Sequence, residues 1–266
     1  MSKKRNTVCV LAAALALGIF AAPRLARAQA AEPVQFKTAD GVTIYGSYYP
    51  AKGTMQPMIL LFHQAGSNHY EYAPIAPKLV TAGFPCLAID QRWGGEMFGH
   101  ENETVQKLGH AETAAGNIAH LQADLEAAFQ WARQKDPGRT IILWGSSYSA
   151  SLVFPLAAEH PQEVSAVLAF SPGEYFERDP RMIRDAAAKV HGPVFITSEN
   201  DPERLSDATR IFEAVASNDK VHYKAQYAVH GSATLREDRN PQGAAANWRA
   251  VMHFLAQFSP EIKPGT

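Results

Sequence analysis

Apolar residues follow two alternating patterns along this chain. In the first, five to seven mostly apolar residues follow one another without interruption, at 57–63, 84–90, 140–145, 164–170 and 193–198. Such continuous runs are typical of strands that are buried on both faces of a parallel sheet. Near the start, 34–38 and 42–50 flank the turn pair Asp40-Gly41, which predicts an antiparallel hairpin. A last strand is predicted at 220–229.

The second pattern has apolar residues at spacings of three and four, as on one face of a helix. It predicts helices at 72–80, 118–132, 148–159, around 211–215 and at 248–258. The two patterns place eight strands and these five helices, out of about six helices expected in all. Because strands and helices alternate, we expect a mostly parallel eight-stranded sheet with helices on both faces.

The N-terminal segment has the pattern of a secretory signal peptide. Residues 3–5 are basic, 8–22 are apolar, and small residues around Ala28 and Ala30 provide a cleavage site. The apolar run is shorter than the ~20 residues that a membrane-spanning helix needs, so stable membrane insertion is not expected. We therefore expect residues 1–28 to be removed, with cleavage near 28–30, and residues 29–266 to form a single domain. This domain would be exported to a bacterial periplasm or the medium.

Charge argues against a nucleic-acid partner. The full chain has 25 basic and 26 acidic residues, but five of the basic ones and none of the acids lie in residues 1–28. The remainder carries 20 basic against 26 acidic residues, a net charge of −6, whereas phosphate binding needs clustered basic side chains. Cys86 is the only cysteine beyond the signal segment and is predicted to be a buried thiol.

A candidate nucleophile follows the predicted strand at 140–145. In Gly145-Ser146-Ser147-Tyr148-Ser149, a sharp turn from strand to helix would expose the Ser147 hydroxyl at the end of the sheet. The neighbours two residues away must be small, because strand and helix pass closely there. The alternative is a serine-rich helix cap without a catalytic role.

A serine nucleophile needs a histidine base and usually a carboxylate that orients it. Asp201 follows the strand at 193–198, and His230 follows the last predicted strand, so the order along the chain is Ser, Asp, His. Glu199 and Asp207 are alternatives for the acid. His222 lies inside the last predicted strand, where a structural role is expected.

Two further groups complete the candidate site. The backbone N–H groups of Tyr148 and Ala65 are candidate donors to the oxyanion that forms on an attacked carbonyl. Ala65 lies in the loop after the predicted strand at 57–63. His63, at the start of this loop, is expected to pack against it. Arg92 could bind a substrate carboxylate through two parallel hydrogen bonds, or it could brace the loop that follows it. The connection at 93–116 is long and is expected to shape or cover the cleft.

Metal and nucleotide chemistry receive no support. His100, His110 and His120 recur every ten residues, which matches no usual zinc spacing. Gly94-Gly95 lacks the Lys and Ser or Thr of a phosphate-binding loop. We therefore expect neither a metal nor a cofactor.

The chain resembles the α/β-hydrolases, and within them the dienelactone hydrolase-like branch. The resemblance covers the chain beyond the signal segment and rests on HQAGSNHYEYAPIA (63–76), AIDQRWGG (88–95), GSSYS (145–149), SENDP (198–202) and VHGSA (229–233). It implies hydrolysis through an acyl-enzyme on Ser147, with His230 as base and Asp201 orienting the imidazole.

Two positions depart from the pattern of that branch. Dienelactone hydrolases proper have cysteine as the nucleophile, so Ser147 favours an ordinary small or medium carboxylic ester as the substrate. Ser149 replaces the second glycine of G-x-S-x-G. A peptidase or an acyltransferase would use the same three residues, and a catalytically silent binding module is the alternative from another class. A histidine base also predicts that activity falls at acid pH.

Overall fold

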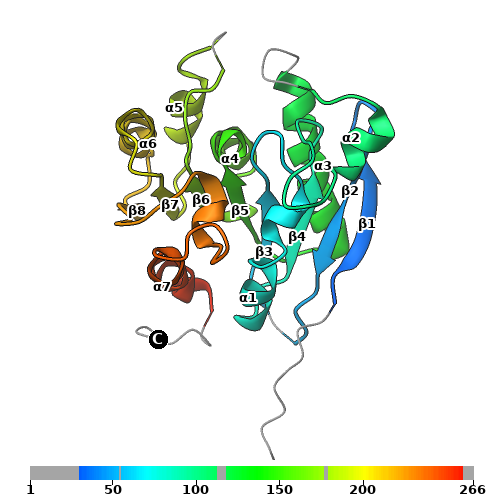
Figure 1. Ribbon diagram of the computed structural model, residues 1–266, viewed down its shortest axis with the longest axis horizontal. Coiled ribbons are helices and arrows are strands. Elements are labelled where there is room, and N and C mark those ends of the chain that lie inside the picture. Colours follow the sequence, from blue (N-terminus) through cyan, green and yellow to red (C-terminus); the bar gives the residue numbers. More distant parts are fainter. Residues whose placement is uncertain (1–29, 54, 113–117, 177–178, 260–266) are drawn as a thin grey trace, which may run out of the picture.

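Within residues 30–53, 55–112, 118–176 and 179–259, which the computed structural model describes, eight strands form one sheet (Figure 1). Their order across the sheet is β1-β2-β4-β3-β5-β6-β7-β8, and only the β1–β2 and β2–β4 pairs are antiparallel. The predicted mostly parallel sheet is confirmed. The strands are β1 Glu32–Lys37, β2 Thr43–Tyr49, β3 Met58–Phe62, β4 Cys86–Asp90, β5 Ile141–Ser146, β6 Val164–Phe170, β7 Val194–Thr197 and β8 Lys220–Tyr223.

Helices cover both faces of this sheet (Figure 1). One face packs against α3 (Ile118–Lys135), α4 (Tyr148–Glu159), α5 (Met182–Ala187) and α6 (Pro202–Ala214). The other face packs against α1 (Ala76–Thr81) and α7 (Ala244–Leu255). In β5, for example, Leu143 joins the first core and Trp144 the second. A strand with apolar neighbours on both faces needs a continuous apolar run, which is why this pattern was readable in the sequence.

Shorter elements complete the fold. They are α2 (Glu103–Leu108) and the 3-10 helices η1 (His69–Tyr72), η2 (Gly231–Leu235) and η3 (Ala256–Phe258). In the part of the chain that the structure describes, none of the helices combines the length and the apolar character that a membrane crossing needs. Residues 1–29 lie outside the described part, so the signal peptide stays a prediction.

Three segments differ from the predicted elements. The last strand ends at Tyr223 and not at 229, because its only neighbour is the four-residue β7 and their pairing ends at Thr197 and Tyr223. Helix α2 lies inside the long connection, where Asn102 caps its start and Gly109 ends it in a left-handed conformation. Helix α5 lies between β6 and β7. Both missed helices have six residues, too few for a clear periodicity.

The strand order reverses beside β3, and this places the candidate site. The chain leaves β3 toward β4 on one side, whereas β5 pairs with β3 on the other side and leads on to β6. In open α/β sheets, ligands bind at the carboxyl ends of the strands where the order reverses. The loop after β3 carries Ala65 and the turn after β5 carries Ser147, so the fold brings these two segments together.

Candidate active site

Ser147 lies in a strained turn between β5 and α4. Its backbone has φ 59° and ψ −123°, a left-handed conformation that side chains rarely adopt. Gly145 makes the turn possible, because a Cβ at this position would lie 2.4 Å from the Ser149 carbonyl oxygen. Ser149 is itself useful here, since its hydroxyl donates to the His63 carbonyl at 2.7 Å. The serine that replaces the usual glycine therefore ties α4 to the end of β3.

His230 meets Ser147 directly. Its Nε2 lies 2.7 Å from Ser147 Oγ, although the two residues are 83 positions apart. His230 begins the turn that leads into η2, seven residues after β8 ends. Ser147 and His230 therefore lie together, as the sequence predicts. Contrary to expectation, His230 does not directly follow the last strand but follows the loop after it.

The acid that contacts His230 is Glu199. Its Oε1 lies 2.6 Å from His230 Nδ1, and its Oε2 accepts a hydrogen bond of 2.5 Å from the Ser171 hydroxyl. Burial alone would raise the pKa of Glu199, but the hydrogen bonds from His230 and Ser171 lower it to about 2. The ionised carboxylate therefore requires a proton on Nδ1, which leaves Nε2 free to accept the Ser147 proton.

The prediction of Asp201 as this acid is wrong. Asp201 is exposed and caps α6, where its Oδ1 accepts from the backbone N–H of Glu203 at 3.0 Å and of Arg204 at 3.1 Å. The sequence holds the signal for this role, because Asp before Pro202 is a typical helix start. Asp207, the other alternative, pairs with Arg210.

Two backbone N–H groups near Ser147 have no acceptor within the described part of the chain and could meet an oxyanion. Tyr148 is the first residue of α4, so its N–H has no acceptor within the helix. In the loop after β3, Gln64 N–H donates to Glu71 and Gly66 N–H to the Trp93 carbonyl. Ala65 N–H, between them, has no acceptor among the described residues. Their role in binding an oxyanion stays a prediction.

Arg92 does not face a substrate. Its side chain is 1% exposed, and its Nη1 and Nη2 donate to Asp40 at 2.6 and 3.0 Å. Its Nε and backbone N–H donate to Asp124, both at 2.8 Å. Arg92 thus joins the β1–β2 turn to α3. The substrate-binding prediction is wrong, because two carboxylates already occupy this guanidinium. Arg92 is a brace, but for the β1–β2 turn against α3 and not for the loop that follows it.

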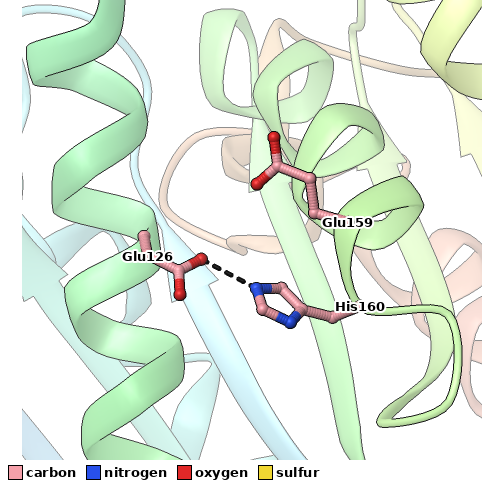
Figure 2. A group of neighbouring side chains, drawn as sticks. All are labelled: Glu126, Glu159 and His160. Atoms are coloured by element: carbon pink, nitrogen blue, oxygen red, sulfur yellow. Dashed lines mark hydrogen bonds and ion pairs between the residues drawn. The ribbon is translucent and has the colours of Figure 1, made fainter.

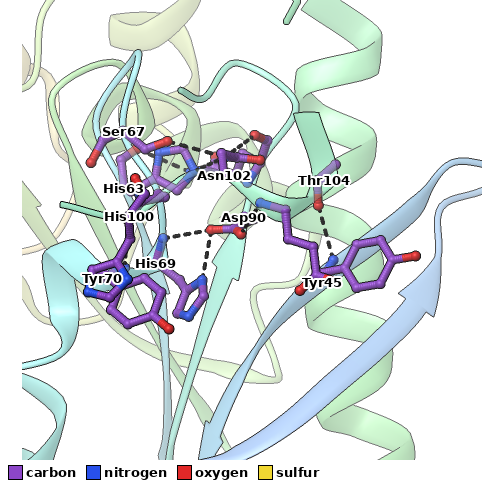
Figure 3. Close-up of polar contacts among 12 residues, drawn as sticks. Tyr45, His63, Ser67, His69, Tyr70, Asp90, His100, Asn102 and Thr104 are labelled. Carbon is purple, nitrogen blue, oxygen red and sulfur yellow. Dashed lines mark hydrogen bonds and ion pairs between the residues drawn. The ribbon is translucent and has the colours of Figure 1, made fainter. Parts of the chain in front are cut away.

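His63 belongs to a buried polar cluster that fixes the loops after β3 and β4 (Figure 3). Its Nε2 accepts from Gln91 N–H at 2.9 Å. Burial lowers its pKa to about 4, so the ring is neutral near pH 7. In the same cluster, Asp90 accepts from the backbone N–H of His69 and of Glu103, both at 2.7 Å. His63 therefore packs the loop, as expected.

Sequence reasoning missed two residues next to the nucleophile. Ser171 follows β6 with φ 59°, and its hydroxyl orients Glu199. The Tyr175 hydroxyl donates to the Ser171 carbonyl at 2.8 Å, and its side chain also interacts with that of Ser147. Burial raises the pKa of Tyr175, so the phenol keeps its proton. The position of Ser171 directly after a buried strand was a signal that could have identified it. Tyr175 gave no such signal, because it lies outside the helices and strands.

Among the residues that the structure describes, one group of side chains could hold a metal ion, and it lies away from this site. Donor atoms of Glu126, Glu159 and His160 lie within 4.8 Å of one another (Figure 2). Glu126 Oε2 and His160 Nε2 are 2.8 Å apart and join α3 to the end of α4. Ser147 precedes the other end of this 12-residue helix, about 18 Å away. The Glu126–His160 contact explains why two of the three side chains lie together, and Glu159 is exposed beside them.

Comparisons with known proteins show which proteins this chain resembles. The sequence profile of the family described as serine aminopeptidase, S33, matches residues 53–238, more than half of the chain. The quorum-quenching protein AidA of Acinetobacter baumannii is 27% identical over 148 residues, which make up 54% of this chain. The match spans less than half, 44%, of that protein's length.

Solved structures show the same fold. A dienelactone hydrolase from Anabaena variabilis superimposes with a TM-score of 0.66 at 19% identity, over 88% of this chain and 100% of that one. An esterase of Pyrococcus furiosus gives a TM-score of 0.63 at 16% identity, over 86% and 92% of the two chains. Together with the profile match, these likenesses place the protein: it belongs to the serine aminopeptidase S33 family of the α/β-hydrolase superfamily.

Proposed function

We propose that the protein is a serine esterase that cleaves small or medium carboxylic esters through an acyl-enzyme on Ser147. One observation carries the proposal. The hydroxyl of Ser147, the imidazole of His230 and the carboxylate of Glu199 form a continuous chain of hydrogen bonds of 2.7 and 2.6 Å. In this order, nucleophile, base and acid are the parts that acyl transfer by serine requires.

The first half of the reaction forms the acyl-enzyme. Ser147 Oγ attacks the ester carbonyl carbon while its proton passes to His230 Nε2, and ionised Glu199 stabilises the imidazolium. The carbonyl oxygen becomes an oxyanion that the N–H groups of Ala65 and Tyr148 would bind. When the bond to the alcohol oxygen breaks, His230 gives its proton to the leaving alkoxide.

The second half returns the free enzyme. His230 takes a proton from water, whose oxygen attacks the acyl carbon, and then returns the proton to Ser147 Oγ as the acid leaves. The known structures with this fold include esterases and a dienelactone hydrolase, which supports ester substrates.

A peptidase is the second candidate, because the matching family is described as a serine aminopeptidase. The same three residues would serve, with an amine as the leaving group in place of an alcohol. Hydrolysis of amino-acid p-nitroanilides, compared with p-nitrophenyl esters, separates the two. Faster turnover of the anilides would replace the esterase assignment by the peptidase one.

The experiment that tests the proposal compares the wild-type chain with Ser147→Ala on p-nitrophenyl acetate and butyrate. Because the nucleophile is removed, we expect kcat to fall on the order of 10⁴–10⁶-fold. Ser206→Ala changes an exposed serine of α6 and serves as the control, with activity near that of the wild type. Equal rates for wild type and Ser147→Ala would overturn the proposal.

We also propose that the enzyme acts outside the cytoplasm. The basic, apolar and small-residue order of residues 1–28 supports export. Fractionation of a bacterium that expresses the full chain tests this. Activity confined to the cytoplasmic fraction, with an uncleaved N-terminus, would contradict it.

A further inference from the structure

A second buried carboxylate lies beside the three residues of the proposed mechanism. Glu71, on η1, is 0% exposed. Its Oε1 accepts a hydrogen bond of 2.6 Å from the Ser146 hydroxyl, and its Oε2 accepts one of 2.9 Å from the backbone N–H of Gln64. The acyl-transfer steps give Glu71 no task. A fully buried carboxylate is costly to keep, so its contacts need an explanation.

The two oxygens of Glu71 lead to the two loops on which the reaction depends. Gln64 directly precedes Ala65, whose N–H is the predicted oxyanion donor. On the other side, the Ser146 hydroxyl accepts the backbone N–H of Ser232 at 2.9 Å, two residues after His230. One carboxylate thus connects two segments: the oxyanion loop (residues 63–68), which carries Ala65, and the histidine loop (residues 224–236), which carries His230.

A second serine–carboxylate pair, Ser171 and Glu199, holds the histidine loop in the same way as Ser146 and Glu71. Ser171 Oγ donates to Glu199 and accepts the backbone N–H of Gly231 at 2.9 Å. A hydroxyl has one proton, so donating it to a carboxylate leaves the oxygen lone pairs free for a backbone N–H. The backbone N–H groups of the two residues that follow His230 are therefore each accepted by a serine hydroxyl that donates its own hydrogen bond to a carboxylate.

Packing shows how closely the Ser146–Glu71 pair supports this loop. A Cβ at Gly231 would lie 2.2 Å from Ser146 Oγ and 3.7 Å from Glu71 Oε1, and the residue has φ +65°. Arg236, at the end of η2, donates to the backbone carbonyls of Tyr70 and Glu71 at 2.9 and 3.1 Å. The histidine loop and η1 are therefore in contact at several points, with the Ser146–Glu71 pair between them.

We propose that Glu71 is a positioning residue: through Ser146 and the Gln64 peptide it fixes His230 and the oxyanion loop in the geometry of the transition state. The inference rests on the proposed function. A misplacement of about 1 Å can cost on the order of 10²-fold in rate. Loss of the pair should therefore lower kcat while KM stays close to its wild-type value.

The test uses Glu71→Gln, Ser146→Ala and the double variant in the full chain, with p-nitrophenyl butyrate as the substrate. Each single variant should lower kcat about 10- to 100-fold with KM changed less than threefold. Because both changes break the same connection to the histidine loop, the double variant should lose much less than the product of the two single effects. The rate of labelling by a fluorophosphonate, which reports attack by Ser147, should fall in parallel.

Thermal unfolding separates positioning from a merely structural role. Glutamine has the shape of glutamate and carries no charge whose burial costs free energy, so Glu71→Gln should unfold near the wild-type temperature. Asp124→Asn is the control, because Asp124 is also 0% exposed and also accepts a backbone N–H, that of Arg92, but its hydrogen bonds join α3 to Arg92 and reach neither the loop of Ala65 nor the loop of His230. It should lower stability more than kcat.

Every outcome decides the inference. A folded Glu71→Gln with kcat within threefold of the wild type overturns it, and so do a change confined to KM or fully multiplicative losses in the double variant. If Glu71→Gln does not fold, Ser146→Ala is judged by the same limits. A wild type that neither hydrolyses esters nor reacts with the fluorophosphonate would instead refute the proposed function itself.

Discussion

Glu199 and Asp201 lie two positions apart, and only Glu199 contacts the histidine. Both residues have carboxylate side chains and lie in the short segment between the end of β7 and the start of α6. Asp201 starts α6, where its Oδ1 accepts the first N–H groups of that helix. Glu199 lies before the helix, and its longer side chain reaches His230. The helix start therefore decides which carboxylate orients the base.

Paired substitutions test this assignment. Glu199→Gln places an amide against His230 Nδ1 and removes the charge that stabilises the imidazolium, so we expect kcat to fall on the order of 10³–10⁴-fold. Asp201→Asn should keep activity within twofold, because Asn and Asp cap helices about equally well. Steady-state kinetics on a p-nitrophenyl ester measure both. If Asp201→Asn lost more activity than Glu199→Gln, the assignment would be wrong.

At the scale of elements, the junction of β5 and α4 sets the position of the nucleophile. The strand runs straight into the helix through one residue with positive φ, and Gly145 lets the helix backbone approach the strand. The sequence pattern G-x-S-x-S predicted this junction, because the turn requires small residues two positions before and two positions after the serine. Which loop supplies the acid was less readable, because it depends on the path of an irregular segment.

Gly145→Ala tests the junction. The added Cβ would lie 2.5 Å from the Ala150 backbone nitrogen, so strand and helix must separate. We expect the free energy of unfolding to fall by about 2–3 kcal/mol, together with a loss of kcat. Gly41→Ala is the control, since Gly41 has φ +88° but nothing within 4 Å of an added Cβ. It should cost about 1 kcal/mol through backbone strain and leave kcat unchanged. Urea unfolding that ranked the two variants in the reverse order would contradict this account.

At the scale of the whole molecule, the sequence predicted the centre of the sheet well because strands β3 to β7 are buried almost throughout. Continuous apolar runs such as 58–62 and 141–144 can be recognised without knowledge of their neighbours. The early end of β8 could not be predicted, since it depends on the length of β7 beside it. The same holds for Arg92, whose role is set by Asp40 and Asp124, distant in sequence and opposite to it in charge.

The ionisation of Glu199 also affects the stability of the whole fold. Its pKa is lowered from 4.5 to about 2 in the folded protein. A carboxylate with a depressed folded pKa stabilises the fold above its unfolded pKa, and this contribution is lost as the pH falls toward the folded value. The free energy of unfolding should therefore decrease more for the wild type than for Glu199→Gln between pH 5 and pH 2. Urea titrations at several pH values measure the gap, and a gap independent of pH would contradict the expected ionisation.

The most direct test of the proposed mechanism is covalent labelling of the wild-type chain with a fluorophosphonate, followed by mass spectrometry of its peptides. The reagent needs an activated serine, so we expect one label per chain, on Ser147, and almost none when His230 is replaced by Ala. No label, a label on another serine, or equal labelling of His230→Ala would contradict the mechanism.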